Sequence, residues 1–303
     1  MKRRIITSGV MLAMAGIMLG SCQKEDGAKT EVPAANNESA AHNKLTIAAV
    51  NSTWNIDWNN KTNGATYTSS QANGDFGNVS GWNDSRAYTT NGKDGTVGSR
   101  VTLLPGQLSG AGGLVANSVI QAGAAYEMDY DVKFHSQFNW SRGGKVGFGF
   151  GIGEHNTGGD AAWDGNGGTL RLMWYSPDSN PGRVYFQPYL YYKDMNGGPS
   201  SGNNFGDTFG KTYPTTGALV KGQWYHVHLY IKSNTGSNTD GHVQIVIDGN
   251  IILDQNIRWT TNDSKRMIDQ LTFHTFRGGS QSYWTANTTD YIYYDNLKVH
   301  RIN

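Results

Sequence analysis

Four residues have the types and the spacing to perform chemistry together: Lys145, Arg171, Tyr189 and Tyr191. Each stands in a segment where polar or glycine positions alternate with apolar ones, the period-two pattern of a half-buried strand. The apolar residues of each segment would face the core. If the three segments share one sheet, the four side chains lie together on its opposite face.

These residue types could cleave a uronic-acid polymer by β-elimination. That reaction removes the proton alpha to the sugar carboxylate and expels the sugar linked through O4. Lys145 and Arg171 could neutralise the carboxylate and stabilise the enolate-like intermediate. Nearby cations should lower the pKa of a tyrosine, so that Tyr189 or Tyr191 acts as base and then as acid. The alternative is that the same face only binds sugar.

Other polar residues could support this face as substrate-binding groups. They are Thr169, Gln187, His228 and His274. His226 and His228 are two apart, so both rings face the same side of one strand. Because the sequence shows no third ligand, we predict no zinc site there. The proposed chemistry requires no cofactor, and a structural calcium ion in a loop remains an open alternative.

A row of acidic residues suggests a different enzyme class. Glu127, Asp129 and Asp131 share one face of the segment 125–134. A pair of carboxylates on one strand can serve a glycoside hydrolase as nucleophile and acid. The other interpretation is a solvated acidic face over a buried apolar one, and it is the one we favour.

The N-terminus predicts export. Three basic residues, Lys2–Arg4, precede an apolar run that ends just before Cys22. This pattern predicts a lipoprotein signal peptide over residues 1–21, with Cys22 acylated. Residues 22–43 lack apolar periodicity and are interpreted as a flexible linker. We therefore expect an exported outer-membrane lipoprotein that faces the cell surface and contacts the membrane only through its lipid.

The remaining residues, 44–303, are expected to form a single all-β domain. The chain has 40 glycines, 16 tyrosines and 9 tryptophans, and alternating segments separated by turns recur along it. We predict a jelly-roll β-sandwich, concanavalin-like, with two antiparallel sheets, a concave substrate-binding face and no helix. The loops 153–168 and 193–217 are predicted to wall the binding face, while residues 51–95 should form loops or short edge strands.

Charge and cysteine content limit the partners. The formal net charge is +1, and no basic stripe occurs, which argues against nucleic acid. Cys22 is the only cysteine of the chain, so the mature domain has neither a disulfide nor a thiol nucleophile. An acidic polysaccharide is the expected partner, and the protein is expected to be a monomer.

A series of short motifs between about residues 125 and 301 resembles polysaccharide lyase family 14, the alginate and glucuronan lyases. The motifs are Gly143–Lys145, Thr169–Trp174, Tyr189–Tyr191, Gly222–Trp224, Asp240–Gln244, Phe273–Gly279 and Tyr294–Leu297. The resemblance implies a jelly-roll lyase with a catalytic lysine at Lys145, an arginine at Arg171 and a Tyr-x-Tyr pair at Tyr189 and Tyr191. Thr169 stands where the family often has serine, and residues 146–148 depart from the usual Leu-Pro-Gly.

Overall fold

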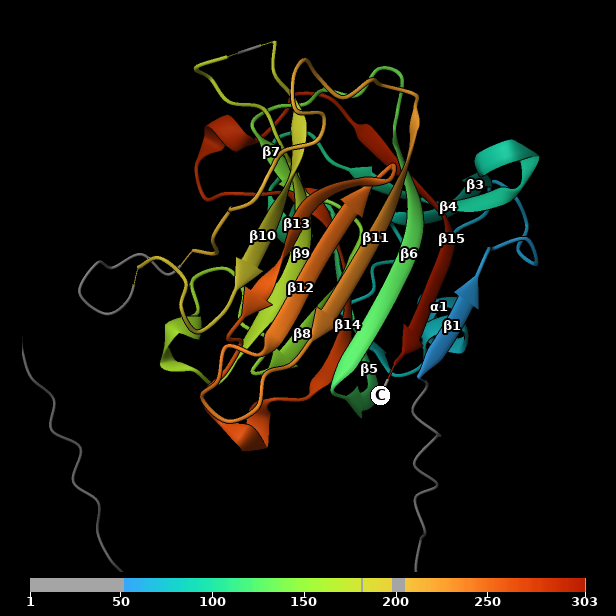
Figure 1. Ribbon diagram of the computed structural model, residues 1–303. Helices are drawn as coiled ribbons and strands as arrows, with labels where there is room; N and C mark the ends of the chain where they lie inside the picture. The colour runs from blue at the N-terminus through green and yellow to red at the C-terminus, as the bar shows by residue number, and fades with distance from the viewer. Residues whose placement is uncertain (1–51, 181, 198–204, 303) are drawn as a thin grey trace, which may run out of the picture. The chain divides into compact units, whose positions relative to one another are not determined.

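Two antiparallel sheets pack face to face and together contain all the strands of the described chain (Figure 1). The computed structural model describes residues 52–180, 182–197 and 205–302, all within the unit Ile47–Asn303. The expected all-β jelly-roll sandwich is therefore confirmed. The predicted signal peptide, Cys22 and the linker lie outside the described residues.

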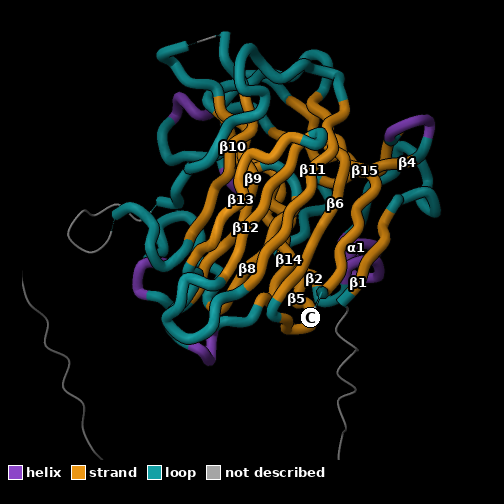
Figure 2. Tube along the Cα trace, viewed as in Figure 1, coloured by secondary structure: helices purple, strands orange, loops and turns teal. Residues whose placement is uncertain are grey.

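The eight-stranded sheet has the order β13-β12-β11-β6-β15-β4-β3, and β1 pairs with β15 (Figure 2). Its strands are β1 (Thr53–Ile56), β3 (Ala87–Asn91), β4 (Val97–Leu103), β6 (Ala125–Phe134), β11 (Trp224–Lys232), β12 (Gly241–Ile247), β13 (Asn250–Ile257) and β15 (Asp290–Arg301). The Asp-Gly turn joining β12 to β13 has φ of 47° at Asp248 and 75° at Gly249, as expected for a tight hairpin.

The seven-stranded sheet has the order β10-β9-β7-β14-β5-β2, and β8 pairs with β14 and β9. Its strands are β2 (Val79–Ser80), β5 (Leu114–Gly123), β7 (Gly143–Lys145), β8 (Phe148–Gly153), β9 (Gly167–Tyr175), β10 (Tyr185–Tyr191) and β14 (Ile268–Arg277). The three segments with alternating residues therefore share one sheet, as expected.

The core lies between the sheets and is rich in aromatic rings. Phe148 stacks on Phe273 with ring centroids 4.3 Å apart, and Tyr294 packs edge-on against Phe273. The Tyr294 hydroxyl lies 2.7 Å from the Thr275 hydroxyl, so its polar end is satisfied inside the core. Burial of the inward side chains leaves the outward ones to face solvent or ligand.

A bulge interrupts the strand that carries the lysine. Lys145 pairs with Met173 and Phe150 pairs with Leu170, so five steps on one strand oppose three on its neighbour. Gly147 has φ of 79°, and a Cβ on it would lie 2.7 Å from the Tyr130 ring in the core. Strict alternation with Lys145 would place Gly147 on the outer face, and this expectation is wrong because the bulge breaks the alternation.

Two short α-helices contradict the expectation of a chain without helices. They are α1 (Ser69–Phe76) and α2 (Ser109–Gly112). The Thr68 hydroxyl and the Gln71 side chain form a capping box at the start of α1, a signal readable from their spacing. In the described part of the chain, no helix has the length and apolarity needed to cross a bilayer. Short 3-10 helices occupy Lys93–Gly95, Ala162–Asp164, Asp263–Lys265 and Ser282–Trp284.

Candidate active site

The outer face of the seven-stranded sheet carries a cationic hollow of about 280 Å³. Tyr189, Arg171, Lys145 and His274 line it from the adjacent strands β10, β9, β7 and β14. Tyr189 lies directly opposite Arg171 in the strand register. The sheet therefore brings together four residues that are far apart in the sequence.

Lys145 is nearly buried at the floor of the hollow, with 8% of its surface exposed. Its Nζ lies 3.5 Å from the centroid of the Tyr189 ring, a cation–π geometry. Burial and, secondarily, the positive charge of Arg171 hold the pKa of Lys145 well below its usual value. A neutral amine at this position can accept a proton.

Arg171 is also buried, and its Cζ lies 5.3 Å from the Tyr189 ring and 5.4 Å from the Tyr191 ring. Among the described residues, its Nε and Nη2 have no hydrogen-bond acceptor. Burial lowers the pKa of Arg171 from its usual value, but a guanidinium stays protonated in proteins. Arg171 therefore presents a fixed positive charge with unused donors, which suits a carboxylate.

The two tyrosines differ in access. Tyr189 lines the hollow, whereas Tyr191 is fully buried behind it. Burial raises the pKa of Tyr189 above its usual value, and the neighbouring Tyr191 adds to the rise, while Arg171 opposes it. The expectation that nearby cations lower the tyrosine pKa is therefore wrong for Tyr189, because desolvation of a phenolate outweighs their attraction. Tyr189 remains a proton donor.

His274 lies at the far side of the hollow and is 4% exposed. Its Nε2 is 3.0 Å from Oδ1 of Asn117; an amide oxygen only accepts, so Nε2 donates. Burial and the charges of Arg171 and Lys145 hold the pKa of His274 well below its usual value. The ring is therefore neutral, and its Nδ1 is an acceptor with no partner among the described residues.

Two of the expected substrate-binding residues lie at the edge of this arrangement. Thr169 is fully buried, and its hydroxyl donates to the carbonyl of Asn156 at 2.9 Å. Thr169 thus ties the loop 153–168 to the sheet and does not face the hollow, which corrects its expected role. Gln187 donates from Nε2 to Sδ of Met173 at 3.2 Å, beside the hollow.

His228 was expected on the binding face, but it lies on the other sheet. It lies on β11 in the eight-stranded sheet, and its Nδ1 is 3.0 Å from Oδ1 of Asp129. The Asp129 hydrogen bond raises the pKa of His228. Alternation along β11 gave its face correctly but could not reveal which sheet the strand joins. His228 therefore does not belong with Lys145.

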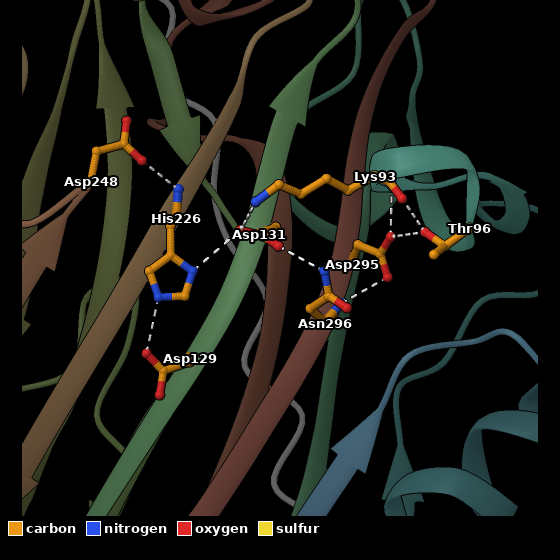
Figure 3. A network of polar contacts seen from close by, with 8 residues as sticks. All are labelled: Lys93, Thr96, Asp129, Asp131, His226, Asp248, Asp295 and Asn296. Carbon is orange, nitrogen blue, oxygen red and sulfur yellow. Dashed lines mark hydrogen bonds and ion pairs between the residues drawn. The ribbon is translucent and has the colours of Figure 1, made fainter.

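The acidic row of β6 is engaged in structural contacts. Asp131 accepts from Lys93 at 3.1 Å and from Asn296 at 2.8 Å, and it contacts His226 (Figure 3). Glu127 pairs with His300. These contacts do not support a glycoside hydrolase site at Glu127 and Asp131. In the residues that the structure describes, no group of three or more His, Cys, Asp or Glu is arranged to hold a metal ion.

Both predicted wall loops reach the hollow. Thr157 and Gly158 come from the loop 153–168, and Phe205 comes from the loop 193–217. Sequence analysis missed Asn117, Phe276 and Met173 at or beside the hollow. Strand alternation could have found all three, since each lies on the outward face of β5, β14 or β9.

On one sheet of this jelly-roll sandwich, a buried arginine has donors without a partner among the described residues, an arrangement that suits an acidic ligand. The family model Polysaccharide lyase 14 matches residues 108–297. The chain therefore belongs to polysaccharide lyase family 14 and is a polysaccharide lyase.

Solved structures agree with this assignment. The structure of alginate lyase Aly36B is 59% identical, with a TM-score of 0.78, covering 84% of this chain and 99% of that chain. The PL-14 alginate lyase from Aplysia kurodai shares the fold at 21% identity, with a TM-score of 0.66, covering 82% of this chain and 99% of that chain. No curated protein sequence matches the chain significantly.

Proposed function

We propose that the protein is an alginate lyase that cleaves its substrate by β-elimination in the hollow around Lys145. The observation that carries this proposal is the contact between Lys145 and Tyr189 beside the unpaired donors of Arg171. Aly36B mutants that lack a lysine and a tyrosine, or a lysine and a methionine, were solved with an alginate tetrasaccharide and trisaccharide, respectively. Lys145, Tyr189 and Met173 offer these residue types in one place.

The positions of the side chains in the hollow, together with the directions of their pKa shifts, support the following roles. Arg171 binds the C5 carboxylate and neutralises its charge, which makes the alpha proton easier to remove. Lys145, as a neutral amine, takes that proton. Tyr189 keeps its proton until it donates it to O4 of the departing sugar. His274 accepts a substrate hydroxyl through Nδ1, and Tyr191 supports Arg171 from behind.

The proposed reaction balances. The C5–H and C4–O4 bonds break, a C4=C5 double bond forms, and the hydroxyl proton of Tyr189 ends on O4. Lys145 is then an ammonium and Tyr189 a phenolate, and their proximity allows the proton to pass from one to the other. This transfer restores both groups for the next cycle.

An absorbance screen with alginate, glucuronan and hyaluronan tests the proposal, because elimination creates an unsaturated, absorbing product. We expect absorbance to rise with alginate and to require Lys145. If alginate in the gel slows migration of the protein and no absorbance develops, the protein is a non-catalytic binding protein. New reducing ends without absorbance would indicate hydrolysis, and either result would overturn the proposal.

We also propose that the enzyme acts at the cell surface as an outer-membrane lipoprotein anchored through Cys22. The basic n-region, the apolar run and the cysteine support this location. Cys22→Ser should release the protein from the membrane fraction and abolish incorporation of labelled fatty acid. Unchanged membrane association would contradict it.

A further inference from the structure

A row of alternating aromatic and cationic residues crosses the outer face of the other sheet. Its members face one another in strict register across five adjacent strands, β3, β4, β15, β6 and β11: Tyr88, Arg100, Tyr293, Lys133 and Trp224. Strands in a sheet are about 4.8 Å apart, so the row spans about 19 Å. We call these five residues the sheet-crossing row.

The rings of the row hold its cations in place. Cζ of Arg100 lies 4.8 Å from the Tyr88 ring and 4.5 Å from the ring of Tyr291, which is on the same face. Nζ of Lys133 lies 4.5 Å from the Trp224 ring and 4.8 Å from the Tyr293 ring. Each cation is thus flanked by two rings, which reduces the entropy lost when it binds a ligand.

A hollow of about 270 Å³ opens beside the row, and Lys133 and Tyr293 line it together with Asn91, His135 and Ser136. His135 stacks on Tyr293 with ring centroids 6.1 Å apart and planes at 24°. The site thus combines flat rings, hydrogen-bonding groups and a positive charge. These are the groups that recognise a sugar ring bearing a carboxylate.

The positive charge of the row is not neutralised by the protein. Within the described ranges, neither Arg100 nor Lys133 forms an ion pair with a carboxylate, and Nε of Arg100 is buried without an acceptor. Asp131 shares the outer face of β6 with Lys133, but Lys93, Asn296 and His226 already occupy it (Figure 3). An anionic ligand would therefore find two available cations.

We propose that the sheet-crossing row is a second binding site for an anionic polysaccharide, on the sheet opposite the catalytic one. Sugar rings stack on Tyr88, Tyr293 and Trp224, while Arg100 and Lys133 bind carboxylates of the same strand. The alternation of ring and cation suits a polymer that carries one carboxylate on each sugar. Only the identity of the polymer, alginate, rests on the proposed function.

Such a site would keep the enzyme on its polymer between cuts. Short oligosaccharides bound in the catalytic hollow cannot reach the opposite sheet, so their turnover should not depend on the row. Long chains can engage both sites, and the second contact then raises the local substrate concentration. The row therefore predicts different effects on short and long substrates.

The double variant Arg100→Gln/Lys133→Gln tests the site, since it removes both charges and keeps most of the side-chain volume. Binding to polymeric alginate is measured by affinity electrophoresis in a Lys145→Ala background, where the polymer is not cut. We expect roughly tenfold weaker binding, because the severalfold losses at the two cations combine. Lys298→Gln is the matched control, because Lys298 is exposed on the same face of β15 outside the row.

Two further measurements make the result decisive. With Lys145 intact, Arg100→Gln/Lys133→Gln should turn over an alginate tetrasaccharide at the unaltered rate, which also shows that it folds. If the double variant does not fold, Lys133→Gln alone should weaken polymer binding severalfold. Unchanged alginate affinity, or an equal loss of affinity for a neutral polysaccharide, overturns the proposal.

The outcomes also separate this site from the proposed function. If no uronate polymer is cleaved but the row variants lose alginate affinity, the second site stands and the lyase assignment to alginate fails. If alginate is cleaved and the row variants bind it with unchanged affinity, the lyase assignment stands and the second site is overturned.

Discussion

The outward face of each sheet carries a cluster of buried ionic residues, and the two clusters differ in whether their charged groups have partners. On the seven-stranded sheet, Lys145 and Arg171 are buried with no carboxylate partner among the described residues. On the eight-stranded sheet, Asp131 is buried among Lys93, Asn296 and His226, which satisfy it (Figure 3). Burying an unpaired charge is costly. A fold retains such charges where a ligand supplies the missing partner, so pairing distinguishes the buried cluster proposed to be catalytic from the buried structural cluster around Asp131.

Replacing Lys145 should have the largest effect. Lys145→Ala removes the proposed base, and general acid–base catalysis typically contributes about 10²–10⁴-fold. We expect kcat on alginate to fall by about 10³-fold, followed by absorbance, with an unchanged circular dichroism spectrum. Lys298→Ala, on the opposite sheet, should retain full activity. Residual activity above a tenth of the original would exclude Lys145 as the base.

Variants of the two tyrosines should differ in activity, because Tyr189 is proposed to react and Tyr191 only to support the site. Tyr189→Phe removes the proposed acid and should lower kcat by about 10²-fold, whereas Tyr191→Phe should stay within a few-fold of the original. The difference follows from the position of Tyr189 in the hollow and of Tyr191 behind it. Steady-state rates of the two variants provide the comparison. Equal losses would mean that the buried hydroxyl also takes part.

The pH profile should report the lowered pKa of Lys145 and the raised pKa of Tyr189. As pH rises through the lowered pKa, Lys145 loses its proton and kcat/KM increases; it decreases only where Tyr189 loses its proton. Because the folded-state pKa of Lys145 is lowered, the unfolded chain binds more protons between that value and about 10.5. The stability of the enzyme relative to Lys145→Met should therefore increase with pH across that window, as measured by thermal unfolding.

Among the predicted changes, the smallest effect on activity is expected in the buried structural cluster around Asp131. Asp131→Ala leaves Lys93 and Asn296 without their acceptor and should lower the free energy of unfolding by about 1–3 kcal/mol. Catalysis should be unchanged, because Asp131 lies on the other sheet. Denaturant unfolding and the absorbance assay measure the two quantities. Asp254→Ala, at an exposed site on β13, is the control and should change stability little.

Strand alternation predicted the outward direction of the residues that carry the proposed chemistry, but it failed at the bulge around Gly147. The sequence alone placed Lys145, Arg171 and Tyr189 on one face, because side chains on a strand alternate with period two. It could not assign His228, since nothing in the sequence of β11 specifies the sheet it joins. The resemblance to polysaccharide lyase family 14 narrowed the possible activities to that of a lyase.

Burial depends on distant contacts and was not predictable. A Cβ on Gly206 would lie 2.7 Å from the Tyr191 ring and 2.9 Å from the Tyr189 ring, so that loop packs closely over the pair. The bulge at Gly147 depends in turn on pairing with β9 and on the Tyr130 ring. The exposure of each tyrosine to the hollow and the pairing register at the bulge therefore depend on tertiary contacts. Residues adjacent in the sequence do not determine them.

The contact between Lys145 and Tyr189 has a stereochemical consequence. With Lys145 as the proposed base and Tyr189 as the proposed acid, both groups would stand on one side of the sugar ring. The C5 proton would then leave and the O4 proton arrive from that side, a syn elimination. In mannuronate and glucuronate, the C5 hydrogen and O4 lie on the same side of the ring; in guluronate, the C5 epimer of mannuronate, they lie on opposite sides. The proposed roles of these two side chains therefore predict a preference between epimers of the polymer, with mannuronate blocks cleaved faster than guluronate blocks.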